Sequence, residues 1–132
     1  MTESTPRPNV LLVQRVYEAF AQRDNQAMLD RFADDVELEQ SPQVPWGGRY
    51  RGHDQALQFF AALTSRVSSH VVFDRYIDAG DDVVVLGRSH GTIIATGRAF
   101  DVPIAHFWRM QDGRVTQIRF CIDIPTIVPA LG

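Results

Sequence analysis

Residues 99–124 read AFDVPIAHFWRM, then QDG, then RVTQIRFCIDI, and they carry a clear strand-turn-strand pattern. Apolar and polar side chains alternate through the two long runs, which is typical of β-strands that place one face on a core. The Asp-Gly pair at 112–113 favours a tight hairpin turn between them. We therefore predict two long antiparallel strands near the C-terminal end, at 99–110 and 114–124.

Further strand-like runs precede this hairpin. Residues 71–78 end at the turn sequence AGDD, and residues 83–95 end at the turn sequence TGR. With the hairpin, these runs predict a meander of four strands from residue 71 onward. Residues 36–40, VELEQ, alternate in the same way and predict an earlier strand, which is followed by a Gly- and Pro-rich loop at 41–52.

Amphipathic segments in the N-terminal half predict three helices. The first runs over 9–23 with Asn9 as its N-cap, and the third begins near His53 and Asp54. Between them a shorter helix, capped by Asp24 or Asn25, carries Met28, Leu29 and Phe32 on one side. The apolar stripe of the first helix consists of Val13, Val16, Tyr17 and Phe20. Helices followed by strands indicate an α+β fold. We expect a cone-shaped α+β barrel, with three N-terminal helices packed on a curved mixed or antiparallel sheet.

Length and composition fit one domain at 9–132, preceded by a disordered or extended arm at 1–8. The 13 basic residues, all arginine, are scattered among 16 acidic ones, which argues against nucleic-acid and membrane partners. Cys121 is the only cysteine, so an intrachain disulfide is excluded, and we expect it to fill the core. Without signal-peptide features or a long apolar run, the expected location is cytoplasmic.

Asp123 is the first candidate for chemistry because it lies between Ile122 and Ile124, directly before Pro125. If its neighbours bury this carboxylate, its pKa rises and it becomes a general acid or base near neutral pH. The alternative is an Asp at the end of a strand that is solvated or accepts backbone N–H groups. Alternation places Ile122 on the apolar face and Asp123 on the other, so reaching a cavity requires a twist or bulge.

A sheet that curls around helices leaves a conical space between the two layers. We expect this space to be lined by aromatic residues and to bind a small apolar molecule, although most of these rings also serve the core. The aromatic candidates are Tyr17, Phe20, Phe59, Phe60, Phe107 and Phe120.

Three other residues are candidates for the same space. Gln40 continues the inward face of its strand, where its amide either orients a substrate oxygen or bonds to backbone. His106 is either a base or donor in the pocket or a packed histidine at a subunit interface. Trp46 is either a lid over the cone or an anchor for its loop. The histidines lack metal-ligand spacing and no phosphate-binding loop is present, so we expect neither metal nor cofactor.

Three segments resemble the nuclear transport factor 2-like superfamily, which includes the ketosteroid isomerases and the SnoaL-like polyketide cyclases. They are VQRVYEAF at 13–20, WGGRYRGHD at 46–54, and the region 102–123, which begins VPIAHFW. The resemblance extends from about residue 9 to the C-terminus. It implies the cone-shaped fold and a small-molecule site, but one such fold hosts many reactions.

The resemblance also indicates which reaction is not expected. Ketosteroid isomerases use a tyrosine, a base aspartate and a protonated aspartate where this chain has Val16, Gln40 and Ala105. Neither Gln nor Ala can transfer a proton, so steroid isomerisation by that arrangement is not expected. Tyr17 is one residue further along the helix, about 100° around its axis, and still belongs to the apolar stripe.

SnoaL-like cyclases carry an acid/base aspartate on the last strand, followed by an apolar segment that ends in Leu-Gly. Asp123 and the terminal Leu131-Gly132 match this pattern. The resemblance therefore implies a cofactor-independent enzyme, such as a cyclase, isomerase, dehydratase or hydrolase, acting on a small apolar carbonyl- or hydroxyl-bearing substrate. In that hypothesis Asp123 moves the proton while Tyr17 and Gln40 orient substrate oxygens. The alternative is a non-catalytic domain for small-ligand binding or dimerisation.

The predicted strands carry apolar residues on both faces, and three helices cover only one face. The superfamily commonly closes the other face by pairing sheets across a two-fold axis. We expect a homodimer, with Trp108 or its strand neighbours at the interface.

Overall fold

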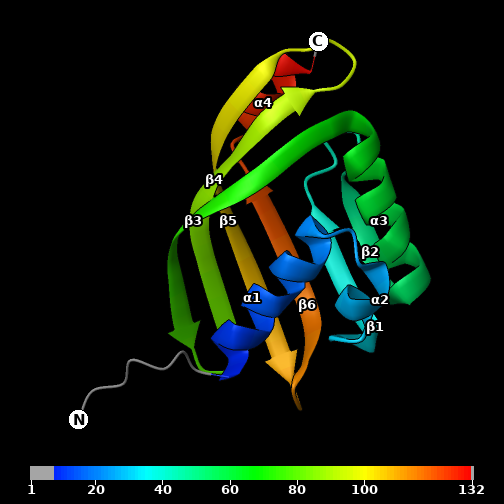
Figure 1. Cartoon of the computed structure of the whole chain (residues 1–132), viewed down its shortest axis with the longest axis vertical. Coiled ribbons are helices and arrows are strands. Elements are labelled where there is room, and N and C mark those ends of the chain that lie inside the picture. The colour runs from blue at the N-terminus through cyan, green and yellow to red at the C-terminus, as the bar shows by residue number, and fades with distance from the viewer. Residues whose placement is uncertain (1–7, 132) are drawn as a thin grey trace.

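The computed structural model describes residues 8–131, in which one long curved sheet is covered by helices on its concave side (Figure 1). The arm predicted at 1–8 lies outside the described residues except for Pro8, which begins the first helix. None of the helices in the described part of the chain is both long and apolar enough to cross a membrane. In chain order the elements are α1 (Pro8–Ala21), α2 (Asn25–Leu29), β1 (Phe32–Gln40), β2 (Gly48–Arg51), α3 (Gly52–Arg66), β3 (Val67–Ala79), β4 (Asp82–Ile93), β5 (Ala99–Gln111), β6 (Arg114–Ile122) and α4 (Ile124–Ala130).

The strands form a single mixed sheet in the order β2-β1-β6-β5-β4-β3. Strands β1 and β6 are parallel, and the other neighbouring pairs are antiparallel. Helix α1 crosses the concave face and α3 lies beside it (Figure 1). The predicted α+β architecture, with three N-terminal helices on a curved mixed sheet, is confirmed.

The β5–β6 hairpin forms as the sequence predicts. Asp112 and Gly113 have φ angles of 53° and 77°. A two-residue turn with both φ angles positive matches the right-handed twist of the strands it joins, and Asp-Gly tolerates this conformation well. The turn pairs Gln111 with Arg114. A register shift between Met110 and Arg109 then leads to the pairing of His106 with Phe120.

Sharp curvature between β3 and β4 depends on two glycines in β4. A Cβ atom on Gly87 would lie 2.2 Å from the carbonyl oxygen of Val72, and one on Gly91 would lie 1.9 Å from that of Ser68. Any side chain at these positions would push β3 away. The glycines therefore let β3 fold closely over β4, which creates the concave face on which the helices pack.

Several elements differ from the sequence prediction. The loop at 41–52 contains β2, and the tail after Asp123 forms helix α4 instead of an irregular apolar segment. Helix α2 ends early because Phe32, expected on its apolar side, begins β1 and is fully buried there. Asn9 lies inside α1, where its side-chain amide donates a hydrogen bond to the carbonyl oxygen of Gly80 at 3.0 Å.

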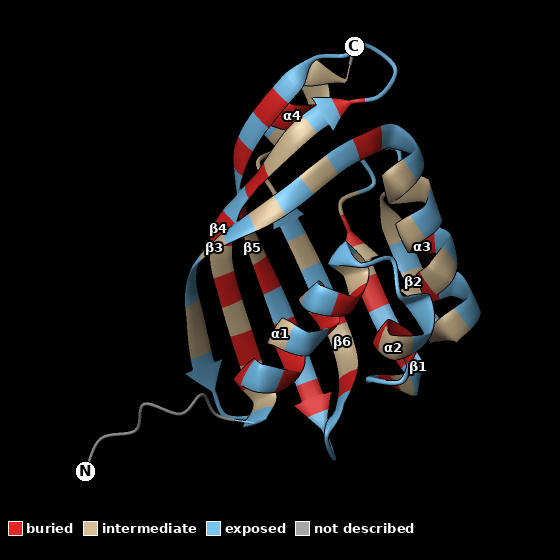
Figure 2. Ribbon diagram, viewed as in Figure 1, coloured by how far each residue is buried: buried red, intermediate tan, exposed pale blue. Residues whose placement is uncertain are grey.

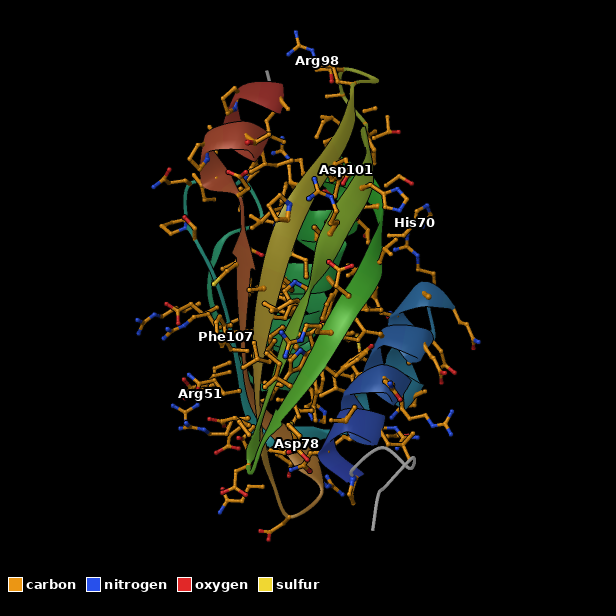
Figure 3. All side chains as sticks on the ribbon, turned by 90° about the vertical axis from the view of Figure 1, so that its left-hand side faces the viewer. Arg51, His70, Asp78, Arg98, Asp101 and Phe107 are labelled. Carbon is orange, nitrogen blue, oxygen red and sulfur yellow. The ribbon has the colours of Figure 1, made fainter. Side chains whose placement is uncertain are left out.

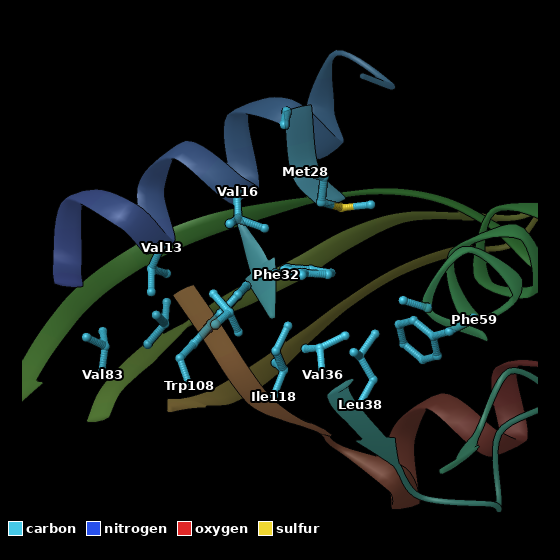
Figure 4. Packing of buried hydrophobic residues seen from close by; sticks show 14 of the residues in the cluster. Val13, Val16, Met28, Phe32, Val36, Leu38, Phe59, Val83, Trp108 and Ile118 are labelled. Carbon is cyan, nitrogen blue, oxygen red and sulfur yellow. The ribbon is translucent and has the colours of Figure 1, made fainter. Parts of the chain in front are cut away.

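The core lies between the helices and the concave face of the sheet. Buried and exposed positions alternate along β5, so that one side of the strand faces the helices and the other faces outward (Figure 2). Figure 4 shows the inner side chains of β1, β4, β5 and β6 meeting those of α1, α2 and α3. Its labelled members include Val13, Val16, Phe32, Leu38 and Ile118, each at most 2% exposed.

Three residues lie on the side opposite to the one expected. Trp108 is only 2% exposed and faces the core, so it is not available to a partner subunit. Phe107, expected in the cavity, is 44% exposed on the outer face because it alternates with His106 and Trp108. Cys121, expected in the core, is exposed on the same outer face, opposite Ala105.

Candidate functional site

A cavity of about 350 Å³ lies between α1, α3 and the concave face of the sheet. Its wall is largely apolar and comes mainly from α1, α3 and strands β3 to β6, with single residues from α2, the end of β1, the segment before β2 and α4. The volume is in the range of sites for small organic ligands, which are typically apolar with a few polar groups. The chemistry of the site therefore depends on the polar side chains that reach the wall.

A hydrogen-bonded set of three side chains forms the main polar feature. The Tyr17 oxygen and His106 Nδ1 are 2.6 Å apart, and Trp108 Nε1 donates to the Tyr17 oxygen at 3.2 Å. An indole N–H can only donate, so the Tyr17 oxygen accepts from Trp108. Among the described residues, the one acceptor available to the Tyr17 proton is His106 Nδ1. This assignment places the His106 proton on Nε2.

His106 Nε2 is available to a ligand. In the described part of the protein, Nε2 has no hydrogen-bond partner. Every fully buried side-chain nitrogen or oxygen there does have a partner, so Nε2 is not fully buried. Nε2 is therefore open to the cavity that His106 lines. The Tyr17–His106–Trp108 set consequently presents one N–H donor to the cavity, and its remaining polar atoms are engaged with one another.

Burial keeps both titratable members of this set uncharged near neutral pH. Desolvation lowers the pKa of His106 to about 3, since the imidazolium form loses its hydration. Desolvation also raises the pKa of the Tyr17 hydroxyl well above its ordinary value, while the Trp108 hydrogen bond opposes that shift. A neutral imidazole and a neutral phenol donate hydrogen bonds, and neither is a strong base under these conditions.

Aromatic rings hold this set in place. The Phe120 ring meets the edge of His106 with centroids 4.9 Å apart and stacks on Phe59 at 5.0 Å. Tyr17 packs against Phe73 at 4.5 Å and against the Trp108 ring at 5.2 Å. Such ring pairs have preferred geometries, so they fix the orientation of the imidazole as well as burying it.

Gln40 supplies a second polar group at the end of β1. The residue is only 6% exposed and lines the cavity. Its side-chain amide has no hydrogen-bond partner among the described residues. Because no unpartnered side-chain nitrogen or oxygen there is fully buried, the Gln40 amide is accessible from the cavity. The amide is thus free to bind a ligand oxygen, and the alternative in which it bonds to backbone does not occur among the described residues.

Most of the candidates predicted from the sequence meet at this cavity. Its lining includes Tyr17, Phe20, Gln40, Trp46, Phe59, Phe60, His106 and Phe120. Trp46 is 3% exposed, and the Tyr50 hydroxyl donates to its carbonyl oxygen at 3.1 Å, which fits the anchored-loop alternative better than a lid. Phe107 is not part of the lining, because it lies on the outer face.

Asp123 is placed apart from the other candidates. Its carboxylate caps α4, where Oδ1 accepts from the Thr126 N–H at 3.3 Å and Oδ2 from the Thr126 hydroxyl at 2.9 Å. It does not line the cavity. The twist that would have turned Asp123 inward does not occur, because the chain enters a helix at Ile124. The placement matches the alternative in which this residue accepts backbone N–H groups.

Two contributions to the site were not recognised in the sequence. Trp108 donates to Tyr17, and Arg23 lies in the cavity wall just after α1. The strand alternation already placed Trp108 on the same face as His106, so a signal for its role was present. Arg23 follows the helix in an irregular turn, where no periodicity indicates its direction. Within the described residues, no three His, Cys, Asp or Glu side chains come together in a way that would hold a metal ion.

The sequence profile of the SnoaL-like domain family matches residues 13–118. No curated protein matches the chain. Among solved structures, an NTF2-like protein of unknown function from Burkholderia pseudomallei K96243 is 26% identical, with a TM-score of 0.89 over 96% of this chain and 98% of the other.

Two more distant structures share the fold. A protein designated a SnoaL-like polyketide cyclase, from Jannaschia sp. CCS1, is 22% identical, with a TM-score of 0.85 over 99% of this chain and 97% of that one. TerC, co-crystallised with polyporic acid, is 24% identical, with a TM-score of 0.85 over 95% of this chain and 98% of its own.

The cap formed by Asp123 makes a first prediction. Asp123→Ala removes the acceptor for both Thr126 groups and should lower the free energy of unfolding by about 1 kcal/mol. Asp123→Asn retains a good N-cap side chain and should lose less than half of that amount. Urea denaturation measures both values. Equal stability of the Ala variant and the wild type would contradict the capping role.

The buried His106 makes a second prediction, about pH. The folded state keeps His106 neutral down to pH of about 3, whereas the unfolded chain protonates it below its ordinary value of 6.5. Stability contributed by His106 is therefore present above pH 6.5 and is lost as the pH falls toward 3. Between pH 7.5 and pH 5 this loss amounts to about 2 kcal/mol.

The measurement compares wild type with His106→Gln, which cannot titrate, by urea denaturation at both pH values. The other titrating groups are common to the two proteins, so their contribution cancels in the difference. The wild type should lose about 2 kcal/mol more than the variant on going to pH 5. Parallel pH profiles would show that His106 is not held neutral.

Proposed function

Since the chain belongs to the SnoaL-like domain family, we propose that it is a cofactor-independent enzyme whose cavity binds a small, largely apolar molecule. The substrate carries a carbonyl group, and the enzyme polarises that group to promote acid/base chemistry at the neighbouring carbon. The observation that carries the proposal is the Tyr17–His106–Trp108 set, which directs one N–H donor into an aromatic cavity.

The geometry suits stabilisation of a developing enolate. As a proton leaves the carbon next to a carbonyl, the electron pair moves to the oxygen, and a fixed donor at that oxygen stabilises the charge. His106 Nε2–H supplies this donor, and Tyr17 holds the ring by donating to Nδ1. The Gln40 amide offers a further contact to the same or a neighbouring oxygen. Because the site is buried, such hydrogen bonds are stronger than they are in water.

The proton acceptor limits the substrate class. His106, with a pKa of about 3, is a weak base, and no Asp or Glu is found in the described cavity wall. The leaving proton must therefore be acidic enough for water to accept it. A methylene between two carbonyl groups meets this condition. We accordingly favour a 1,3-dicarbonyl compound with a further carbonyl group. The enolate carbon attacks that carbonyl carbon, its π electrons move to its oxygen, and this oxygen takes up the proton that water accepted.

A second function is favoured by the same absence of carboxylates from the described cavity wall. The polar groups and aromatic wall would also suit a domain that binds a carbonyl compound without transforming it. In that case His106, Gln40 and the aromatic rings determine only how tightly the ligand binds. Kinetic measurements separate this function from the first, since both predict binding.

The test uses benzoylacetone as a probe, because it is an apolar 1,3-diketone whose enol and keto forms absorb differently. Binding should quench the fluorescence of the two tryptophans, both in the cavity wall. The wild type should accelerate ketonisation, and His106→Gln should lower the rate about 100-fold, as for loss of a preorganised donor. Tyr17→Phe should lower it by a smaller factor of about ten, since the donor remains but loses its support.

Asp123→Asn serves as the control variant, and its rate should equal that of the wild type. A large loss of rate in this folded variant would assign the proton transfer to Asp123 instead. Binding of the probe without acceleration would favour the non-catalytic function. If the wild type neither binds nor accelerates the probe, the proposed function is rejected.

We also propose that two copies pair through the outer face of the sheet. Phe107 is 44% exposed there and Val72 is 52% exposed (Phe107 is marked in Figure 3). Ion pairs flank them, with Arg88 Nε 2.7 Å from Asp101 and Arg109 Nε 2.9 Å from Asp82. An exposed apolar surface with a charged border is typical of a subunit interface, and an isologous dimer covers it on both copies.

Phe107→Glu places a charge in this surface and should convert a dimer of twice the 14.9 kDa chain mass into a monomer. Leu11→Glu is the matched control, because Leu11 is 41% exposed on α1, away from the outer face. Sedimentation equilibrium at micromolar concentration measures both masses. A wild type that remains at the mass of one chain at all concentrations would exclude the dimer.

A further inference from the structure

The charge distribution around the cavity indicates more about its ligand. Among the described residues in the wall, Arg23 is the only one with a permanent charge, and none is an Asp or Glu. The other polar side chains in the wall are neutral or belong to histidine. A cavity with one fixed positive charge and no compensating carboxylate favours a ligand that brings a single negative charge.

Arg23 is held at the cavity by its own backbone and by an aromatic ring. Its N–H donates to the carbonyl oxygen of Phe20 at 3.0 Å, and its φ angle of 58° turns the chain at the end of α1. The guanidinium carbon lies 5.6 Å from the centroid of the Phe20 ring, which in turn packs against Phe60 at 5.3 Å. A cation over a ring face is oriented while its N–H groups remain free.

The guanidinium has no acidic partner among the described residues. In the part of the chain that the structure describes, no ion pair or side-chain hydrogen bond engages Arg23. By contrast, Arg88 and Arg109 on the outer face each pair with an aspartate. Arg23, the arginine in the cavity wall, therefore has guanidinium N–H groups without a partner among the described residues.

Exposure separates the interior of the cavity from its mouth. His106 and Gln40 are 8% and 6% exposed, so they belong to the interior. Arg23, Ser68 and His70 line the same cavity but are exposed, so they mark its mouth. In Figure 3, His70 lies on β3 close to where α1 ends. The cavity thus has a neutral hydrogen-bond donor inside, an apolar middle and a cation at the opening.

We propose that the ligand is an organic acid whose carboxylate binds Arg23 at the mouth while its carbonyl oxygen reaches His106. A guanidinium presents a planar pair of N–H donors that matches a carboxylate, and the pairing is strongest where the cation is already oriented. This inference rests on the proposed carbonyl-binding function and adds the acidic group and its location. The apolar body between the two groups packs on Phe20, Phe60 and Phe120.

A matched pair of probes tests the inference. Both 4-oxo-4-phenylbutanoate and 4-oxo-4-phenylbutanamide carry an aryl ketone, and only the first is charged. Isothermal titration of the full chain should show the acid binding about fivefold more tightly than the amide, the size expected for a partly exposed charge pair. The preference should decline as salt is raised from 20 to 500 mM, because ions screen the pair.

Arg23→Gln removes the charge and keeps most of the side chain, so it should abolish the preference while leaving amide affinity within twofold of wild type. Arg23→Lys keeps the charge and should retain most of the preference. Arg98→Gln is the control, because Arg98 is exposed on the turn between β4 and β5 (Figure 3) and its loss changes the net charge equally. The Arg98 variant should behave as wild type.

Each contrary result has a separate meaning. Equal wild-type affinity for acid and amide, or equal weakening of both by Arg23→Gln, overturns the role of Arg23 and leaves the carbonyl site standing. If Arg98→Gln also loses the preference for the acid, the preference arises from the net charge of the protein and not from Arg23. That result would also overturn the inference. If neither probe binds the wild type at millimolar concentration, both this inference and the proposed carbonyl site are rejected.

Discussion

The register between β5 and β6 is the constraint on which the cavity depends. The Asp112–Gly113 turn and the register shift between Arg109 and Met110 together set which residues face each other, so that His106 pairs with Phe120 and Trp108 with Ile118. Side chains alternate between the two faces of a strand, so a slip of one residue would exchange the two faces of β5. Phe107 would then enter the core, and His106 would lie outside. The turn and the irregularity that follows it therefore position both His106 and the exposed side chains of the outer face.

Burial then determines the chemical state of the groups that this register brings inside. His106 and Tyr17 are both titratable, yet desolvation holds each in its neutral form, and their mutual hydrogen bond fixes which imidazole nitrogen carries the proton. The site is consequently adapted to donate hydrogen bonds and not to remove strongly held protons. Arg23 lies at the exposed end, where water reduces the cost of keeping a charge.

Asp123 illustrates how local structure competes with a functional interpretation. A carboxylate before Ile-Pro at the end of a strand suits an acid/base group, and it suits a helix N-cap equally well. The sequence contains both signals, since Pro125 falls in the first turn of α4 and Thr126 follows it. The cap satisfies both carboxylate oxygens locally, whereas the cavity would require a bend against the strand alternation.

The order of helices and strands, the β5–β6 hairpin and most of the aromatic wall were predictable from the sequence, because turn residues and periodicity are local properties. It also placed His106 and Trp108 on one face of their strand. It did not determine which face was the inner one, because both faces of β5 carry apolar residues. That decision, the contact between Tyr17 and His106, and the position of Arg23 came only with the tertiary structure. They depend on how closely β3 folds over β4 and where α1 crosses the sheet, and these contacts join residues far apart in the chain.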